Sequence, residues 1–390
     1  MASCDSTDQV RILFALAGLH RVDRGAEVAF IAIASELARI GHEVTLIGSG
    51  PQRPDAPYRF IHAPAAARER FERWPKVPAL RSETGWEEAT FAPGLLRKFR
   101  PSDYDVTATC AFPWTHWALR RPALGGKRPK HVFITQNGDW PAISNDREFR
   151  FFDCDGLVCT NPDYFERNRE RYRCALIPNG VDLERFAPGP AERARFGLAA
   201  GPLVLMVSAL IPSKNVAEGI RAMAEIPDAT LVVAGDGPQR DEIHRLANEL
   251  IPGRFRQITL AAADMPALYR SVDAFLHLST DESFGNVFVE AMASGLPVVA
   301  YDTARTRWII GDEGCFPRKR SPKELAAAIR LALEQGGSSA AMARKRAESF
   351  GWPAIAEEYS RFFEEVQSPL AAPPTRCETQ VRADEGLKRR

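Results

Sequence analysis

Short apolar runs alternate with amphipathic segments along almost the whole chain, and this alternation restricts the fold more than any other feature of the sequence. Residues 10–17 are the first apolar run, residues 26–40 carry apolar side chains at helical spacing, and residues 43–48 are a second run. Gly41 stands between the last two, where a helix needs a C-terminal cap. Strands that alternate with helices in this way predict parallel sheets with helices on their faces.

A stretch rich in proline and glycine divides the apolar runs into two sets. It spans residues 186–202, and its composition is typical of a connection between domains. We expect strands before it at residues 10–17, 43–48, 105–111, 131–136, 156–160 and 175–177, and after it at residues 203–209, 230–234, 257–260, 274–278 and 297–300. The chain is therefore predicted to be an α/β protein in which two doubly wound, Rossmann-like domains face a cleft. Ligands of such sheets bind beyond the carboxyl ends of the strands.

The domain boundaries follow from the same pattern. We predict a first domain at residues 1–190 and a second at residues 191–350. Residues 351–367 have aromatic and apolar positions on one side, and we expect them to form a C-terminal helix that packs back on the first domain. Residues 368–390 are poor in large apolar side chains and are predicted to be a disordered tail.

Bulk composition narrows the possible partners and the compartment. The formal net charge is +1, so we expect no nucleic-acid partner. The seven cysteines form no C-x-x-C pair, which indicates a reducing compartment and argues against a zinc site. No secretory signal opens the chain, and its apolar runs are too short to span a bilayer. We therefore expect a cytoplasmic protein with at most peripheral contact with the inner face of a membrane.

The segment at residues 281–290 carries the clearest chemistry. A strand is expected to end near residue 278, and a helix to begin near Gly285. A helix N-terminus suits a diphosphate because its N–H groups are free and its dipole end is positive, and glycine lets a ligand approach closely. Glu282 and Glu290 could each accept two hydrogen bonds from the vicinal hydroxyls of a sugar or a ribose. Taken alone, the two are better explained as a helix-dipole partner and a solvated glutamate.

The surrounding sequence changes that interpretation. Residues 281–290 resemble the E-x7-E motif of family 4 glycosyltransferases, which are retaining enzymes of the GT-B fold. Further segments resemble motifs of this family and occur in its order at residues 177–188, 207–215, 234–238 and 265–275. The resemblance implies a retaining, metal-independent glycosyltransferase of the hexosyltransferase type, with no cofactor. Its donor would be a nucleotide-diphosphate sugar bound by the second domain, and its acceptor a hydroxyl compound bound by the first.

The resemblance also assigns roles to individual residues. Glu282 would contact the donor sugar, Lys214 would neutralise the diphosphate, and Glu290 would bind the ribose hydroxyls. A lysine suits the diphosphate because it is a flexible point charge aimed at developing negative charge. The other donor-side positions act through the backbone or a turn, and they are Phe284, Gly285, Asn286, Val287 and Gly235.

The second domain departs from the family pattern at one place. Family members usually carry an arginine five residues before the lysine, where this chain has Ala209. Another cation must then substitute, or the affinity for the donor falls. Arg305 and Arg307 are the candidates. Two D-x-D triplets, at residues 103–105 and 153–155, each precede an apolar strand and are interpreted as turns, so no metal site is expected.

The first domain matches the family less well. Gly25 opens a helix after a loop with one glycine where relatives have two, so it either touches the donor or only makes a tight turn. The usual His-x-His positions hold Ala108 and Cys110. His116 lies one loop further on, and it either faces the cleft as a catalytic group or is a polar residue at a helix start.

Side chains after the next strand suit hydroxyl groups and sugar faces. Gln136, Asn137 and Asp139 could bind hydroxyls of the donor or the acceptor. Trp114 and Trp140 could stack on a sugar ring, although aromatic side chains more often belong to a core.

Two other functions remain open at this point. The same fold serves nucleotide-sugar 2-epimerases, and a relative that binds a nucleotide sugar without catalysis would explain Ala209 and the missing histidines. The sequence does not identify the base or sugar of the donor, the residue that replaces the missing arginine, or the oligomeric state. The acceptor could be a glycan, a lipid carrier or a small molecule.

Overall fold

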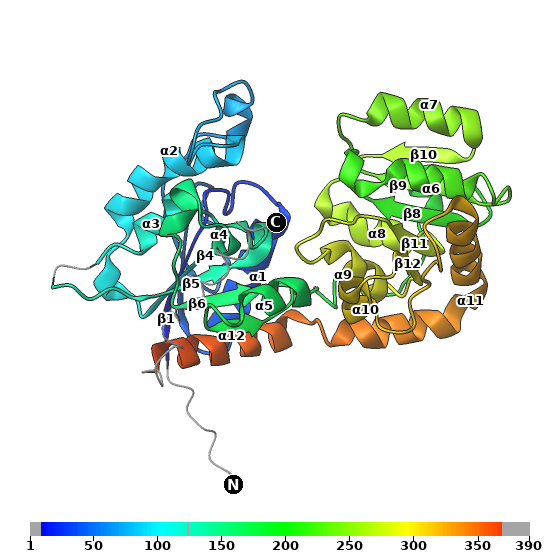
Figure 1. Ribbon diagram of the computed structural model, residues 1–390. Helices are drawn as coiled ribbons and strands as arrows, with labels where there is room; N and C mark the ends of the chain where they lie inside the picture. The colour runs from blue at the N-terminus through cyan, green and yellow to red at the C-terminus, as the bar shows by residue number, and fades with distance from the viewer. Residues whose placement is uncertain (1–8, 123–124, 369–390) are drawn as a thin grey trace, which may run out of the picture.

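The structure is a computed structural model of the chain, and it describes residues 9–122 and 125–368. Two parallel sheets form two domains that lie side by side (Figure 1). The prediction of an α/β fold with two doubly wound domains is confirmed. Nearly all of the expected disordered tail, residues 369–390, lies outside the described residues.

The first sheet has seven strands in the order β3-β2-β1-β4-β5-β6-β7. Every neighbouring pair is parallel. Its strands are β1 (Arg11–Ala15), β2 (Glu43–Gly48), β3 (Arg59–His62), β4 (Val106–Thr109), β5 (Lys130–Ile134), β6 (Gly156–Cys159) and β7 (Cys174–Leu176). The strand order reverses direction at β1, and ligands of such sheets bind beside this point.

The second sheet has five strands in the order β10-β9-β8-β11-β12. All of its pairs are parallel as well. Its strands are β8 (Leu203–Val207), β9 (Thr230–Ala234), β10 (Phe255–Ile258), β11 (Ala274–His277) and β12 (Val298–Ala300). Here the order reverses at β8, next to β11, the strand that leads into residues 281–290.

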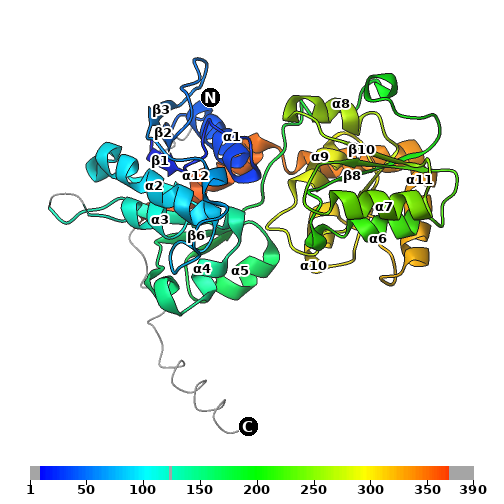
Figure 2. The same ribbon diagram turned by 90° about the horizontal axis from the view of Figure 1, so that it is seen from above.

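Helices cover both faces of each sheet. Those of the first domain are α1 (Gly25–Arg39), α2 (Glu83–Lys98), α3 (Trp114–Leu119), α4 (Trp140–Ile143) and α5 (Pro162–Asn168). Those that follow are α6 (Val216–Met223), α7 (Arg240–Leu250), α8 (Met265–Tyr269), α9 (Asn286–Ala293), α10 (Ala304–Ile310), α11 (Pro322–Glu348) and α12 (Trp352–Gln367). Figure 2 shows α6 and α7 on one side of the second sheet, and α8 and α9 on the other.

Alternating side chains of the strands build a separate core on each face. In β1, Ile12 and Phe14 belong to the core under α1, whereas Leu13 and Ala15 belong to the core under α2. Successive side chains of a strand point to opposite faces, so a sheet buried on both sides needs continuous apolar runs. These runs are the feature that made most strands predictable from the sequence.

The last helix returns to the first domain. Residues 352–366 of α12 share the core of β1 and α1, and Tyr359 and Phe363 are fully buried there. Ser360 lies 2.7 Å from Nε2 of His42, a residue 318 positions earlier in the chain. Figure 1 shows α12, in red, under the first domain. The chain therefore passes between the domains twice, once before β8 and once before α12.

One strand was not predicted from the sequence. β3 is an edge strand whose four side chains are exposed or half-buried, so it lacks the apolar run that marks the other strands. Across the part of the chain that the structure describes, no helix combines the length and the apolar character needed to cross a bilayer.

Candidate active site

Loops from both domains meet in a cleft of about 730 Å³. The first domain contributes the loops after β1, β4 and β5, and the second contributes the loop between β11 and α9. Each of these loops follows the carboxyl end of its strand, and parallel strands bring those ends to one edge of a sheet. The cleft therefore lies where the fold is expected to bind a ligand.

The N-terminus of α9 forms the second-domain wall of the cleft. Gly285 caps this helix with φ +102°, a conformation that favours glycine. A β-carbon placed there would lie 2.8 Å from the ring of Phe288, so a larger residue would also clash. The turn into α9 therefore requires glycine at this position, and the close approach of a diphosphate to its backbone stays a prediction.

The N-terminus of α1 faces α9 across the cleft. Gly25 is the first residue of α1, and a β-carbon placed on it would lie 3.6 Å from Nδ2 of Asn286. Both residues line the cleft. Two helix N-termini thus point at one space, and both contribute free N–H groups and positive dipole ends to it.

Glu282 lies beside these helix ends and is held by two cationic or polar partners. Lys214, at the end of a 3₁₀ turn formed by Pro212–Lys214, donates to its carboxylate, and His277 Nε2 donates at 2.9 Å. Burial alone would raise the pKa of Glu282, but the hydrogen bonds and charges of these neighbours outweigh it and lower the pKa to about 2. Glu282 is therefore an ionised hydrogen-bond acceptor in the cleft.

His277 was not predicted from the sequence as a site residue. It is the last residue of β11 and only 3% exposed. A histidine at the carboxyl end of the strand that leads into residues 281–290 is the signal that would have found it, because side chains at that edge face the ligand site.

Glu290 occupies a more apolar position on α9. The hydroxyl group of Tyr269 donates to its carboxylate at 2.9 Å. Burial raises the pKa of Glu290, and this hydrogen bond opposes the rise. Glu290 is half-buried and is not among the described residues that line the cleft, so its role toward a ribose stays a prediction.

The remaining predicted donor-side residues take different positions. Phe284 lines the cleft, but its ring is buried and packs on Trp308 and Phe350. Val287 packs against the core of the second domain. Gly235 follows β9 with φ +146°, and a β-carbon there would lie 2.1 Å from the carbonyl oxygen of Ser208. Gly235 thus allows the turns after β8 and β9 to come together, and it does not line the cleft.

The expectation that His116 faces the cleft is wrong. Its ring is fully buried and stacks on Phe152 at a centroid distance of 5.0 Å. Its Nδ1 lies 3.1 Å from Nε2 of His131. Burial, followed by the nearby His131 and Arg120, lowers the pKa of His116 well below its usual value. His116 is a neutral core residue because α3 turns it into an aromatic cluster, and we withdraw it as a catalytic residue.

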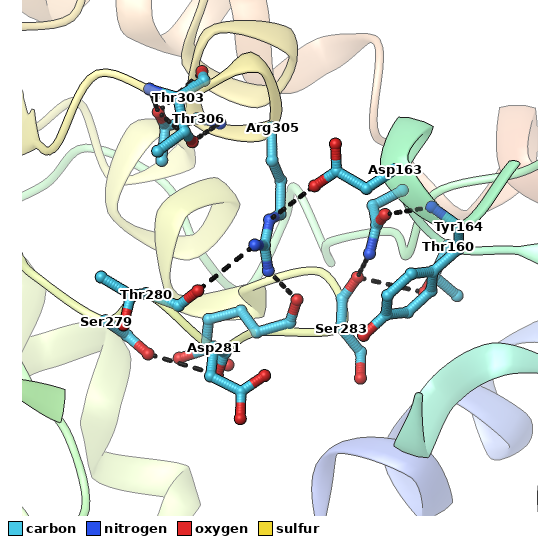
Figure 3. Close-up of polar contacts among 12 residues, drawn as sticks. Thr160, Asp163, Tyr164, Ser279, Thr280, Asp281, Ser283, Thr303, Arg305 and Thr306 are labelled. Carbon is cyan, nitrogen blue, oxygen red and sulfur yellow. Dashed lines mark hydrogen bonds and ion pairs between the residues drawn. The ribbon is translucent and has the colours of Figure 1, made fainter. Parts of the chain in front are cut away.

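Arg305 does not replace the missing phosphate arginine as it stands. Its guanidinium donates to the carbonyl oxygens of Glu282 and Thr280 and lies 3.8 Å from the carboxylate of Asp163 (Figure 3). Arg307 instead pairs with Asp302 and Asp312 at the surface. Arg305 therefore holds the loop before α9 in place.

Side chains of the first domain also hydrogen-bond to this loop, and the sequence analysis did not predict them as site residues. Thr160 Oγ1 donates to the carbonyl oxygen of Ser283 at 3.2 Å, and the Asn161 amide donates to the same oxygen (Figure 3). Asn179 donates to Asn286 Oδ1 at 2.8 Å. These contacts join the segments after β6 and β7 to residues 281–290, so direct hydrogen bonds connect the domains on one side of the cleft.

Buried carboxylates form the floor of the first-domain side. Glu27, Glu87 and Glu88 line the cleft, and none is more than 3% exposed. Arg24 donates to Glu87 at 3.1 Å. Burial raises the pKa of Glu88 to about 7, although the Thr115 hydroxyl donates to it. The sequence did not indicate this cluster, because the residues come from α1 and α2 and meet only in the fold.

Of the polar candidates after β5, Gln136 and Asn137 line the cleft, whereas Asp139 serves the structure of the first domain. Asp139 is 4% exposed and binds Arg167 at 2.9 Å. In the D-x-D triplets, Asp105 binds Arg11 and Asp155 binds Arg128. Among the described residues, no group of three or more His, Cys, Asp or Glu side chains could hold a metal ion.

Both halves of the chain match known families. Residues 24–185 match the family described as Glycosyltransferase Family 4, and residues 191–350 match Glycosyl transferases group 1. The chain is 31% identical over 374 residues to a D-inositol 3-phosphate glycosyltransferase of Mycobacterium marinum, a match that covers 84% of this chain and 78% of the relative.

Matches to other relatives are shorter. The chain is 30% identical to the lipopolysaccharide core biosynthesis glycosyltransferase LpsE of Rhizobium meliloti, over 50% of this chain and 57% of the relative. It is 36% identical to a GDP-mannose-dependent alpha-(1-6)-phosphatidylinositol monomannoside mannosyltransferase of Mycolicibacterium smegmatis, over 32% of this chain and 37% of the relative. The matched region thus spans about half or less of the length of these two proteins.

Solved structures agree with the fold. Sucrose-phosphate synthase from Thermosynechococcus elongatus superposes with a TM-score of 0.72 at 22% identity, over 92% of this chain and 99% of that one. Anabaena HepE in complex with UDP-glucose superposes with a TM-score of 0.68 at 19% identity, over 92% and 100% of the two chains. The chain therefore belongs to the family 4 glycosyltransferases and has their GT-B fold.

Proposed function

We propose that this protein is a retaining glycosyltransferase that moves a sugar from a nucleotide-diphosphate donor to a hydroxyl group of an acceptor, without a metal ion or other cofactor. One observation carries the proposal. The N-termini of α1 and α9 face the same space, directly beside a carboxylate that Lys214 and His277 hold in its charged form. Such a site combines a place for anionic phosphates with a hydrogen-bond acceptor for a sugar.

The donor would bind mainly to the second domain. Its diphosphate would lie at the N-terminus of α9, where the free N–H groups of residues 285–287 and the positive end of the helix favour an anion. The ammonium group of Lys214 pairs with Glu282, and it would also interact with the diphosphate. There it would stabilise the negative charge that develops on the leaving group. Glu282 would accept hydrogen bonds from hydroxyl groups of the donor sugar. HepE, which shares the fold, has been solved with UDP-glucose bound.

The chemical step would be a direct exchange at the anomeric carbon. The bond from this carbon to the diphosphate oxygen breaks, and a bond to the acceptor oxygen forms on the same face of the sugar. The acceptor proton passes to the leaving diphosphate. Catalysis by the protein would then consist of placing the two substrates and of stabilising the charge on the diphosphate. Family membership supports retention of configuration.

A second candidate is a relative that binds the nucleotide sugar and transfers nothing. Ala209 favours it, because the phosphate-facing arginine of the family is missing there. Lys214 also favours it in part, since its charge is already engaged by Glu282. The two candidates differ in turnover and agree in binding.

Melting temperatures and donor hydrolysis test the proposal together. The wild type, Glu290→Ala and the control Glu313→Ala would be measured with UDP-, GDP- and ADP-sugars in the presence of EDTA. Glu313 is an exposed residue of the second domain outside the cleft. A donor at a hundredfold excess over its Kd adds about 2.7 kcal/mol of stability.

We expect one nucleotide class to raise the melting temperature of the wild type and of Glu313→Ala, and to have little effect on Glu290→Ala. Slow release of nucleoside diphosphate in EDTA would support catalysis without a metal. Binding without any release, even with a broad set of acceptors, would favour the second candidate. A protein that responds to no nucleotide sugar would contradict both.

A further inference from the structure

The first-domain end of the cleft carries a wall of aromatic rings. Phe112 follows β4, Trp140 opens α4, and Phe149 belongs to the 3₁₀ turn Arg147–Phe151; all three line the cleft. Trp140 packs edge to face on Phe112 and on Phe149, with centroid distances of 5.9 and 5.0 Å. Its neighbours therefore fix the plane of the Trp140 ring without covering it.

Trp140 differs from the other rings in its exposure. Phe112 is 6% exposed, whereas Trp140 is 39% exposed. A large aromatic surface that faces a cavity is costly to leave in water, and covering it with a ligand recovers that free energy. The other tryptophan singled out in the sequence, Trp114, does not line the cleft, and it donates to the carbonyl oxygen of Ala79 at 2.8 Å. Trp140 is thus the ring that is placed for a ligand.

The charges at this end do not suit an anionic ligand. Three arginines line the cleft, and each lies within 4.0 Å of a carboxylate, in the pairs Arg24–Glu87, Arg68–Glu69 and Arg81–Glu148. Among the described residues that line the cleft, no other side chain carries a positive charge. A phosphate or carboxylate on the acceptor would compete with these carboxylates for the arginines, and it would also approach the buried carboxylates of the floor.

Neutral polar groups surround the aromatic wall instead. Asn137 lies three residues before Trp140, is exposed and lines the cleft. Ser82 and Thr84, at the start of α2, line the same end. Amides and hydroxyls both donate and accept hydrogen bonds, so they match the hydroxyl groups at the edge of a sugar ring. A rigid aromatic face with such a rim is the usual composition of a small-molecule pocket.

We propose that Trp140 is the stacking platform of an acceptor subsite that takes a neutral pyranose ring. The apolar face of the sugar covers the exposed side of Trp140, and its hydroxyl groups meet Asn137 and the start of α2. This subsite rests on the proposed glycosyltransferase function for its role, since it places the acceptor in the same cleft as Glu282. It departs from what the name of the inositol 3-phosphate relative would suggest, because every arginine that lines the cleft lies beside a carboxylate.

Four proteins test the subsite: the wild type, Trp140→Ala, Trp140→Phe and the control Trp74→Ala. Trp74 is 48% exposed and lies outside the cleft, against Phe71 and Trp86. Release of nucleoside diphosphate would be measured at saturating donor with methyl pyranosides, with octyl pyranosides of the same sugars, and with D-myo-inositol 3-phosphate. Saturation-transfer NMR with the methyl pyranosides reports binding without turnover.

We expect a methyl pyranoside to increase release by the wild type and by Trp74→Ala. In Trp140→Ala its KM should rise about tenfold or more, whereas Trp140→Phe, which keeps a ring, should retain most of the affinity. Equal KM values for methyl and octyl compounds would indicate a soluble glycan as the source of the ring, and a lower value for the octyl compound a lipid-linked sugar. Either result supports the subsite if Trp140→Ala raises both values.

Stimulation by D-myo-inositol 3-phosphate alone would overturn the inference, and so would a Trp140→Ala protein with the KM of Trp140→Phe. Failure of the proposed function has a different signature: no donor is turned over by the wild type. NMR then decides the subsite by itself. If saturation transfer to the methyl pyranoside disappears in Trp140→Ala, the proposed subsite is supported. If the transfer is unchanged in this variant, the proposed subsite is contradicted.

Discussion

The two walls of the cleft use the same residue type in opposite ways. On the second-domain wall, Lys214 and His277 hold Glu282 in its charged form and lower its pKa to about 2. On the first-domain floor, burial raises the pKa of Glu88 to about 7, and a threonine hydroxyl is its hydrogen-bond donor. Burial raises the pKa of both glutamates, and only at Glu282 do the neighbouring groups outweigh it.

This difference separates the two halves of the proposed reaction. A wall of fixed charges and helix ends suits a diphosphate sugar, whose charge grows as the bond to the leaving group breaks. The buried carboxylates and the aromatic wall of the first domain offer an anion less, and they suit a neutral sugar. Variants that alter one side of the cleft and leave the other intact can test whether the two sides differ in this way.

The largest effect should come from the charged wall. Lys214→Ala removes the cation from Glu282 and from the proposed diphosphate site, and we expect turnover of the donor to fall about 100- to 1,000-fold. Lys319→Ala is the matched control, since Lys319 is exposed and does not line the cleft. Steady-state kinetics would measure both. A Lys214→Ala protein as active as this control would mean that Lys214 only braces Glu282.

The next effect concerns the buried floor and depends on pH. The folded-state pKa of Glu88 is raised above its unfolded value, so the stability that Glu88 contributes is fully present below the unfolded pKa of 4.5. It is lost as the pH rises through about 7. Between pH 5 and 8 the free energy of unfolding of the wild type should fall by up to about 3 kcal/mol more than that of Glu88→Gln. Denaturant melts across this range would measure it, and parallel curves would show that Glu88 is already ionised at pH 5.

The two glycines that face each other should respond differently to the same change. Gly285→Ala places a β-carbon at positive φ and against Phe288, so it should cost about 1–3 kcal/mol of stability. Gly25→Ala meets only an ordinary contact with Asn286 and should change stability by much less. Chemical denaturation of both variants compares them directly. Equal losses would indicate that the backbone at Gly285 can relax and is not a fixed part of the wall.

The smallest effects should come from the residues that hold the loop before α9 against the first domain. Arg305→Ala leaves two carbonyl oxygens of the loop without their donor, and the donor KM should rise about fivefold, with kcat less affected. Asp163→Asn should cost under about 1 kcal/mol, because Asp163 is 46% exposed and its ion pair with Arg305 spans 3.8 Å. If Asp163→Asn raised the donor KM as much as Arg305→Ala, the first domain would position the loop more strongly than we propose.

The second-domain wall of the cleft was easier to predict, because most of its residues lie close together in the sequence. Residues 281–290 carry the glycine cap and both glutamates within one strand-loop-helix unit, and Lys214 follows the adjacent strand β8. Continuous apolar runs likewise identified the strands, except the half-exposed edge strand β3. The resemblance of this unit to a family motif, and not the spacing of its glutamates alone, indicated their roles.

The first-domain side of the cleft was largely not predicted from the sequence, because its residues come from distant segments of the chain. Glu27 and Glu88 lie 61 residues apart, and neither has a neighbour in the sequence that marks it as buried. His116 shows the opposite error: a histidine near the expected position looked catalytic, yet α3 turns it into the core. Side-chain direction in a short helix depends on tertiary packing, which a single sequence does not reveal.

A crystal structure with a bound nucleoside diphosphate would test the central claim most directly. The account predicts that the diphosphate lies between the N-termini of α1 and α9, within hydrogen-bond distance of the backbone N–H groups of residues 285–287, with Nζ of Lys214 directed at it. A diphosphate bound elsewhere, or at α1 alone with Lys214 still held only by Glu282, would contradict the proposed donor site.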